Sequence, residues 1–188
     1  MLKRKTFYFL RHGQTDWNLA KRIQGQADIP LNESGRLQAI AVAKLVAELD
    51  IGSIFTSSLS RAYETAEIVK AKQDLHISVI EELKEVTIGV RDGDLRGEWY
   101  QRWKTGDIVI SGAESRADFR QRIAVGINKV LAYPETALIV SHGGVYSTLK
   151  EAINIYPEVA LENCMLLKLS PDPDNDTQWL VTVLSDTP

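Results

Sequence analysis

The sequence has a single cysteine, Cys164, and no long apolar run. One cysteine excludes an intramolecular disulfide and a cysteine-rich zinc site. The charged start Met1–Lys5 precedes a short apolar run, Thr6–Leu10, which Arg11 interrupts. A signal peptide requires a longer apolar stretch, and a membrane-spanning helix requires about 20 apolar residues. We therefore expect a cytoplasmic protein that does not use a membrane as a partner.

Positive charge is not in excess either. The chain carries 22 Lys and Arg against 25 Asp and Glu, which gives a formal net charge of -3. Nucleic acids usually select a basic surface, so we expect no nucleic-acid partner. No repeat or long linker divides the 188 residues, a length that suits one sizeable core. We expect residues 1–188 to form a single domain.

Short apolar runs alternate with longer segments of helical periodicity. The expected strands are Thr6–Leu10, Ile51–Thr56, His76–Ile80, Thr136–Ser141, Met165–Ser170 and Gln178–Leu184. The expected helices are one capped by Asn32, whose apolar positions are Leu37, Ile40, Ala41, Leu45 and Leu49, and then Leu59–Lys72, Leu95–Lys104, Ser115–Leu131 and Val145–Asn154. This alternation predicts an α/β fold with three layers, in which helices cover both faces of a mostly parallel sheet.

Two histidines occupy matching places in this pattern. His12 follows the first expected strand and precedes Gly13, and His142 follows the strand Thr136–Ser141 and precedes Gly143. Ligands of open α/β sheets bind at the carboxyl ends of the strands, so both imidazoles are expected at one edge. His76 has no glycine beside it, and we assign it an ordinary structural role.

Two arginines are expected at the same edge. Arg11 adjoins His12, and Arg61 begins the helix after the second strand, although alone it would suggest a surface ion pair with Glu64 or Glu67. Guanidinium groups match phosphate oxygens in shape and charge. There is no Walker A loop and no carboxylate cluster near the histidines, so we expect neither metal nor cofactor. A neutral imidazole can then attack phosphorus directly.

Several motifs resemble those of one known family, the histidine phosphatase superfamily of phosphoglycerate mutase-like enzymes. Arg11–Asn18 fits R-H-G-x-T-x-x-N, Ser57–Ala66 resembles the arginine-bearing helix start, Leu83–Gly89 fits L-x-E-x-x-x-G, and Ser141–Gly144 resembles the second histidine motif. A second conserved stretch is matched by Gln24, Gly25, Asp28, Pro30, Leu31, Gly35, Gln38 and Ala39. The blocks run in the family's order from Phe7 to about Lys150 and imply its phosphoglycerate mutase-like fold.

The resemblance implies a role for each matched residue. His12 would be the phosphorylated nucleophile, with Arg11, Arg61 and His142 as the phosphate clamp. Asn18 would help to hold the phosphate, and the carbonyl of Gly13 would bind one ring nitrogen of His12. Glu85 would be the general acid, and Gln24, Gly25 and Gly143 would contact the substrate.

Two features depart from the family or have open roles. Arg91 stands where many relatives have an apolar residue. It either points to solvent or adds a cation at the rim, which would favour a substrate with a second anionic group. Trp99 and Tyr100 either pack on the sheet or stack on a sugar or an apolar leaving group, whereas packing is favoured for Trp103.

The reaction class is expected to be hydrolysis. Mutases of the family shield the phosphohistidine with a long insertion and a mobile tail, whereas here the segment between Gly93 and Glu114 is short and only residues 185–188 follow the last expected strand. We expect a metal-independent phosphomonoesterase for a small metabolite such as a sugar phosphate or α-ribazole phosphate. The alternatives are phosphoglycerate mutase activity and dephosphorylation of a protein partner, and the chain is either a monomer or a homodimer.

Overall fold

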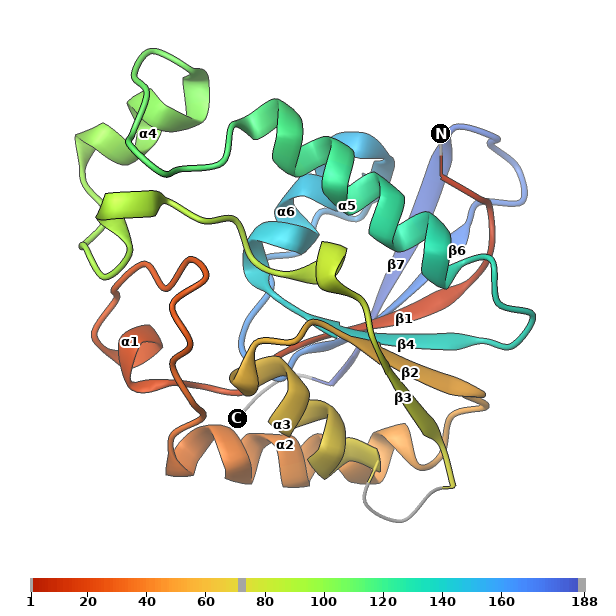
Figure 1. The fold of residues 1–188 in the computed structure, drawn as a ribbon. Coiled ribbons are helices and arrows are strands. Elements are labelled where there is room, and N and C mark those ends of the chain that lie inside the picture. The colour runs from red at the N-terminus through yellow and green to blue at the C-terminus, as the bar shows by residue number, and fades with distance from the viewer. Residues whose placement is uncertain (1, 71–73, 186–188) are drawn as a thin grey trace.

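The chain folds around one seven-stranded sheet, seen in a computed structural model that describes residues 2–70 and 74–185 (Figure 1). Its strands are β1 (Phe7–Arg11), β2 (Ser53–Thr56), β3 (His76–Val79), β4 (Ala137–Ser141), β5 (Asn154–Tyr156), β6 (Leu166–Pro171) and β7 (Gln178–Ser185). The order is β3-β2-β4-β1-β6-β7-β5. The first four strands in that order pair in parallel, whereas β6 is antiparallel to both β1 and β7. The mostly parallel sheet is thus confirmed.

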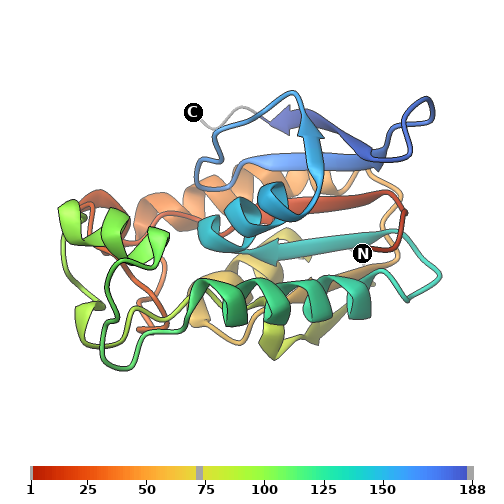
Figure 2. The same cartoon turned by 90° about the horizontal axis from the view of Figure 1, so that it is seen from above.

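Helices cover both faces of the sheet, which confirms the three layers. They are α1 (Asp16–Leu19), α2 (Glu33–Val46), α3 (Ser60–Lys70), α4 (Glu98–Thr105), α5 (Arg116–Val130) and α6 (Gly143–Ala152), with 3-10 turns η1 (Glu81–Leu83) and η2 (Gly89–Arg91). In Figure 1, α2 and α3 lie on one side of the sheet and α5 and α6 on the other. Viewed from above, β5, β6 and β7 form one flank of the sheet (Figure 2).

The alternation of side chains along the central strands builds two cores. Phe7 and Phe9 of β1 pack with residues of α5 and α6, while Tyr8 and Leu10 pack with residues of α2 and α3. Successive strand side chains point to opposite faces, so a strand that is apolar throughout serves both cores. All four of these side chains are nearly or fully buried.

Each predicted strand and helix is present, and its ends shift by at most three residues where the structure describes them. The predicted end of the second helix at Lys72 lies outside the described residues. The sequence pattern missed α1, both 3-10 turns and β5, which are all short. Within residues 2–70 and 74–185, no helix combines the length and apolar character needed to cross a membrane.

The spacing of the large apolar residues indicated the wrong face of α2 as the one that packs on the core. Leu37 and Ile40 are 58% and 52% exposed, and Leu45 is also exposed. The buried side is formed instead by smaller residues, namely Gly35, Ala39, Val42 and Val46. Because α2 approaches its neighbours closely, small residues occupy the contact. The larger apolar residues, whose periodicity guided the prediction, lie on the solvent-exposed side of the helix.

The first turn of α2 touches the loop that carries His12. A Cβ atom added to Gly35 would lie 2.1 Å from the carbonyl oxygen of Gln14, and one added to Gly13 would lie 2.4 Å from that of Gly35. The side chain of Gln38 also accepts a hydrogen bond from the Gln14 N–H at 3.0 Å. Backbone-to-backbone contact therefore fixes the height of the His12 loop above the sheet.

We expect Gly35→Ala to lower the free energy of unfolding by about 1–3 kcal/mol, the usual cost of overpacking, because neither backbone can move independently. Urea denaturation measures the change. Leu37→Ala, on the exposed side of the same helix, is the matched control and should cost less than about 0.5 kcal/mol. Equal stability of the two variants would contradict this account of the contact.

Candidate active site

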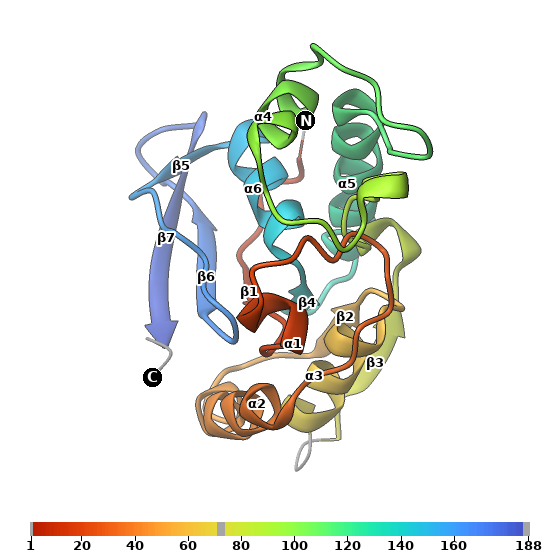
Figure 3. The ribbon, with the colours of Figure 1, turned by 90° about the vertical axis from the view of Figure 1, so that its left-hand side faces the viewer.

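Three adjacent parallel strands, β2, β4 and β1, deliver the expected site residues to one edge of the sheet (Figure 3). Arg11 pairs in register with Ser141, so His12 and His142 follow neighbouring strands at the same level. The His12 N–H donates to the Ser141 carbonyl at 2.9 Å, and the two imidazole centroids are 5.2 Å apart. The predicted convergence of the histidines is confirmed.

The ring of His12 is oriented by its own loop. Its Nδ1 is 2.7 Å from the carbonyl oxygen of Gly13. Because a carbonyl only accepts hydrogen bonds, Nδ1 carries the proton and Nε2 retains the lone pair. The side chain is only 3% exposed and lines the cavity at the sheet edge. The predicted contact between Gly13 and His12 is confirmed.

His142 sits deeper than His12. It is fully buried, and its Nε2 is 2.7 Å from the Oγ of Ser57, the residue that follows β2. Its Nδ1 is buried without a partner in the described part of the chain. His142 does not line the cavity wall, so the structure places it behind His12 rather than beside it. The contact with Ser57 was not anticipated from the sequence, although Ser57 belongs to the motif quoted above.

Both imidazoles are held neutral. The pKa of His12 lies well below its usual value of 6.5. The largest cause is burial, followed by the charge of Arg61 and then that of Arg11. Burial and Arg61 likewise lower the pKa of His142, with smaller contributions from His12 and Arg11. A neutral imidazole is the nucleophilic form, so the buried cations favour the state that can attack phosphorus.

Arg61 is buried and forms no ion pair with a carboxylate among residues 2–70 and 74–185. It is 1% exposed and donates to the carbonyls of Ala27 and Gly25, both at 2.8 Å. The ion pair with Glu64 that Arg61 alone would have suggested is not formed, because Glu64 pairs with Arg36 at 2.6 Å. Burial lowers the pKa of Arg61 to about 10, which still leaves it charged at neutral pH.

Arg11 is held in a similar way. Its Nη1 donates to the carbonyl of Leu161 at 2.9 Å. The Nε atoms of Arg11 and Arg61 are both buried without a partner among the described residues. Unpaired donors are costly in a protein interior, and an oxyanion between the two guanidinium groups would remove that cost.

The other expected substrate contacts line the same cavity, which has a volume of about 380 Å³. They are Asn18, Gln24, Gly25 and Gly143. The Oδ1 of Asn18 accepts from the backbone N–H of Thr15 at 3.2 Å and from Asn163 at 3.3 Å, which leaves its amide NH₂ for a ligand. Gln24 is 8% exposed, and its Oε1 has no partner in the described structure.

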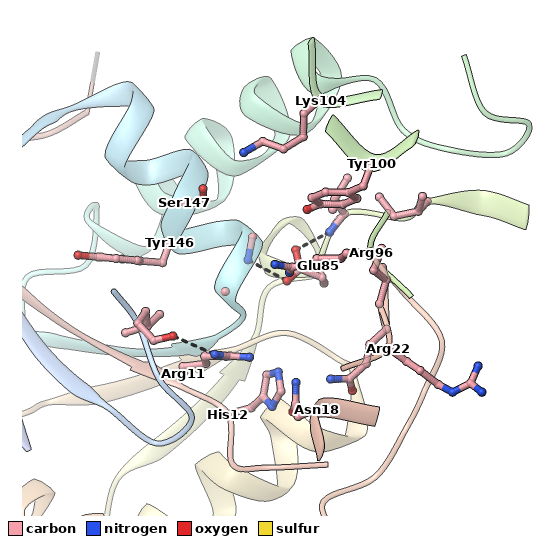
Figure 4. A pocket seen from close by; sticks show the side chains of 18 of the residues that line it. Arg11, His12, Asn18, Arg22, Glu85, Arg96, Tyr100, Lys104, Tyr146 and Ser147 are labelled. Atoms are coloured by element: carbon pink, nitrogen blue, oxygen red, sulfur yellow. Dashed lines mark hydrogen bonds between the residues drawn. The ribbon is translucent and has the colours of Figure 1, made fainter. Parts of the chain in front are cut away.

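Glu85 also lines the cavity. Its Oε1 accepts from the N–H of Val86 at 2.9 Å and its Oε2 from the N–H of Gly144 at 2.8 Å (Figure 4). A Cβ atom on Gly144 would lie 2.0 Å from that carboxylate, so glycine at the start of α6 is what admits it. The contact ties the predicted general acid to the helix that follows His142.

Arg122 of α5 holds the segment that carries Glu85. It donates from Nη1 to the carbonyls of Glu82 and Lys84, both at 2.9 Å, and from Nη2 to that of Glu85 at 3.3 Å. Its Nε and Nη2 bind the carboxylate of Glu114 at 2.7 and 2.6 Å. Glu114 therefore acts as a counter-ion within the fold, while Ser115 caps the N-terminus of α5.

The residues with open roles divide between the cavity and its surroundings. Arg91 is exposed, pairs with Asp94 at 2.9 Å and lies over the ring of Trp99, outside the cavity lining. Trp103 is buried in the core, as favoured. Tyr100 lines the cavity. The rim cation is thus not Arg91.

The sequence did not reveal several lining residues, since they lie outside the matched motifs and reach the site only through tertiary folding. These are Arg22, Lys104, Arg116, Tyr146, Ser147, Lys150 and the segment Val159–Leu161. At the start of α3, the Ser60 N–H donates to the carboxylate of Asp28 at 2.7 Å.

The profile of the histidine phosphatase superfamily (branch 1) matches residues 7–183. The chain belongs to this superfamily. It is 32% identical to a Salmonella choleraesuis (strain SC-B67) protein named "Probable phosphoglycerate mutase GpmB", over 93% of this chain and 87% of that one. A protein of the same name from Cronobacter sakazakii is also 32% identical, with 95% and 92% covered.

Two solved structures are similar to this one over nearly the whole chain. Bacillus stearothermophilus YhfR is similar with a TM-score of 0.81 and 29% identity, covering 97% of this chain and 98% of that one. A mycobacterial glucosyl-3-phosphoglycerate phosphatase, solved with VO3, has a TM-score of 0.78 and 27% identity, covering 98% and 99%. Together these relatives establish a histidine phosphatase superfamily enzyme, either a phosphatase or a mutase.

We expect the free energy of unfolding to fall as the pH decreases from about 7.5 to 5.5. Since both buried imidazoles bind a proton less readily in the folded chain, the unfolded chain takes up more protons below about pH 6.5. Near pH 7.5 and above, both states are almost entirely neutral and the contribution is flat. Each histidine contributes at most about 1.4 kcal/mol per pH unit.

Urea denaturation over this pH range measures the slope in the wild type, in His12→Gln and in His142→Gln. Each of the two variants should show a shallower slope. His76→Gln, on the exposed part of β3, is the matched control. Unchanged slopes in both site variants would show that the imidazoles are not held neutral by the fold.

Proposed function

We propose that the protein is a metal-independent phosphomonoesterase that forms a phosphohistidine at His12 and acts on a small phosphorylated metabolite. The observation that carries the proposal is the orientation of His12, whose Nδ1 is bound to Gly13 so that Nε2 has the free lone pair. Arg11 and Arg61, with unpaired Nε atoms, adjoin it and supply positive charge for the equatorial phosphate oxygens.

The reaction has two steps. His12 Nε2 attacks phosphorus and forms a P–N bond while the P–O bond to the leaving group breaks, and the carboxyl group of Glu85 gives its proton to that oxygen. Water then attacks the phosphohistidine and transfers a proton to the Glu85 carboxylate, the P–N bond breaks, and inorganic phosphate leaves. The enzyme returns to its starting protonation state. Asn18 adds an amide group to the polar surroundings of the phosphoryl group, while His142 lies behind His12 and contacts Ser57.

The small size of the segment that covers the cavity favours hydrolysis over isomerisation. Between Gly93 and Glu114 the chain forms only α4 and its connecting turns, which is a small cover for an intermediate that must avoid water. The similarity to a solved phosphatase supports the same choice. Phosphoglycerate mutase activity is the second candidate, because the curated relatives carry that name.

The partner in this account is the phosphorylated substrate itself, and we place the enzyme in the cytoplasm. The formal net charge of -3 supports a small-molecule partner rather than a nucleic acid. Sugar phosphates and α-ribazole phosphate are the first compounds to assay. The chain functions as a monomer or a homodimer.

We expect His12→Ala to lower turnover by about 10³-fold or more, because the nucleophile is removed. The assay follows phosphate release from p-nitrophenyl phosphate and a panel of phosphorylated metabolites, with EDTA present. The isomerisation of 3-phosphoglycerate is followed in parallel, and predominant isomerisation would favour the mutase. His76→Gln is the control. Retention of more than a few per cent of the activity by His12→Ala, or loss of wild-type activity in EDTA, would overturn the proposal.

Glu85→Gln should slow the hydrolysis of alkyl phosphates about 10²-fold or more and that of p-nitrophenyl phosphate much less, because only a poor leaving group needs the proton. Arg122→Gln should show the same dependence on the leaving group, more weakly, since it releases the Glu85 segment. Lys129→Gln is the control, because Lys129 lies on the same helix and pairs with Glu82 at the surface. Equal losses on both substrates would assign the general acid elsewhere.

A further inference from the structure

The peptide group between His12 and Gly13 is held at both of its polar atoms. Its carbonyl oxygen, which belongs to His12, accepts from the side-chain amide of Asn163 at 2.9 Å. Its N–H, which belongs to Gly13, donates to the Oγ1 of Thr65 at 3.1 Å. Because a peptide group is planar, one bond at each end fixes the orientation of the whole group. Neither side chain is among the described residues that line the cavity, so neither is expected to touch the substrate.

The orientation of this peptide determines where the next carbonyl points. That carbonyl belongs to Gly13 and lies 2.7 Å from the Nδ1 of His12. Glycine has no Cβ, so on its own it would leave the carbonyl free to take many directions. The close approach of Gly35 limits this freedom from one side, and the two bonds to the peptide limit it from the others. The contact that orients the His12 ring thus depends on residues outside its own loop.

Thr65 links the His12 loop to the helix that carries Arg61. It is fully buried on α3, one turn after Arg61. Its hydroxyl donates to the carbonyl of Arg61 at 2.7 Å, a common bond for threonine in a helix. Its one proton is therefore engaged, and a lone pair of Oγ1 accepts from the Gly13 N–H. A single buried hydroxyl sets the spacing between the His12 loop and α3.

Asn163 acts from the other side, in the segment that leads into β6. Its amide also donates to the Oδ1 of Asn18 at 3.3 Å. The N–H of the next residue, Cys164, donates to the carbonyls of Arg11 at 3.1 Å and His12 at 3.3 Å. Cys164 has a φ of 53°, which is uncommon for a residue with a Cβ and costs free energy. A strained turn thus holds the Asn163 amide against the end of β1.

We propose that Thr65 and Asn163 are positioning residues, which hold the His12–Gly13 peptide so that the carbonyl of Gly13 keeps the proton of His12 on Nδ1 and leaves Nε2 free. They come from different elements and act on opposite ends of one peptide, so removal of either should release the same group. The effect on turnover rests on the proposed function, because it requires His12 to be the nucleophile. The effect on the tautomer does not depend on turnover.

The tautomer is measured by ¹⁵N NMR on resting protein labelled at its three histidines. The shifts of the two ring nitrogens report which of them carries the proton, and the signals of His12 are those lost in His12→Gln. We expect the wild type to hold His12 as the Nδ1–H tautomer alone. Thr65→Val and Asn163→Leu keep the approximate size of the side chain and remove its hydrogen-bonding atoms. Each should shift part of His12 to the Nε2–H tautomer.

Turnover is followed with p-nitrophenyl phosphate, whose leaving group does not need the proton of Glu85. We expect Thr65→Val and Asn163→Leu to lower kcat/KM by about 10-fold to 10²-fold, because a displacement of about 1 Å at a reacting atom has an effect of this order. The inhibition constant of inorganic phosphate should change by less than about threefold in Thr65→Val, since Arg11 and Arg61 still bind the phosphate. A merely structural loss would weaken both.

Two variants serve as controls. Thr65→Ser keeps the hydroxyl and loses the methyl group, and it should retain the wild-type tautomer and a kcat/KM within about threefold of the wild type. Thr148→Val makes the same substitution on α6 at a hydroxyl that is buried without a partner among the described residues, and it should change neither quantity. Urea denaturation confirms that each variant is folded. Asn163→Leu, at a half-buried position, provides the test if Thr65→Val does not fold.

The inference is wrong if wild-type His12 populates both tautomers, or if Thr65→Val and Asn163→Leu both keep the Nδ1–H tautomer. It is also wrong if Thr65→Ser is as impaired as Thr65→Val, since the methyl group rather than the hydroxyl would then matter. Failure of the proposed function gives a different result. A changed tautomer with unchanged kcat/KM would support the positioning of the ring and would speak against His12 as the nucleophile.

Discussion

Two guanidinium groups are buried next to two imidazoles, and much of the surrounding structure compensates for this concentration of positive charge. No carboxylate in the described part of the chain forms an ion pair with Arg61; the carbonyls of Gly25 and Ala27, in the loop before α2, bind it instead. The same burial suppresses protonation of His12 and His142. The clamp therefore creates the demand for an oxyanion and keeps neutral the imidazole that we propose as the nucleophile. An arrangement of this kind is destabilising without a ligand, as expected of a site that has been shaped for binding.

The acidic residue of the site is positioned from the other side of the molecule. Glu85 belongs to an irregular segment whose carbonyls are held by Arg122, while its carboxylate reaches the N–H of Gly144 at the start of α6. His142 immediately precedes that helix, so the Glu85 carboxylate is bound to the same helix that begins after the second histidine. Because the sheet positions the histidines and α5 positions Glu85, the distance between nucleophile and acid is set by the packing of α5 and α6 on the sheet.

Much of this was predictable, and the reason lies in the parallel pairing of β1 with β4. Motifs that follow adjacent parallel strands must meet at their carboxyl ends, so His12, His142 and the arginines could be brought together from the sequence. Local patterns failed where contact depends on size or on distant packing. In α2 the large apolar residues Leu37 and Ile40 face outward, because Gly35 and Ala39 make the close contact. Lys104 of α4 and Ser147 of α6 line the same cavity only because tertiary folding brings the two helices to it, and the sequence carries no local signal for that arrangement.

The central claim is a transfer through His12 in two in-line displacements. The stereochemical course at phosphorus tests it most directly, using a substrate whose phosphoryl group is chiral by virtue of oxygen isotopes. Each displacement inverts the phosphorus, so a reaction through phosphohistidine must release phosphate with overall retention. This holds however short-lived the intermediate is. Net inversion would mean that water attacks the substrate directly, and would contradict the account even if every other residue proved to be placed correctly.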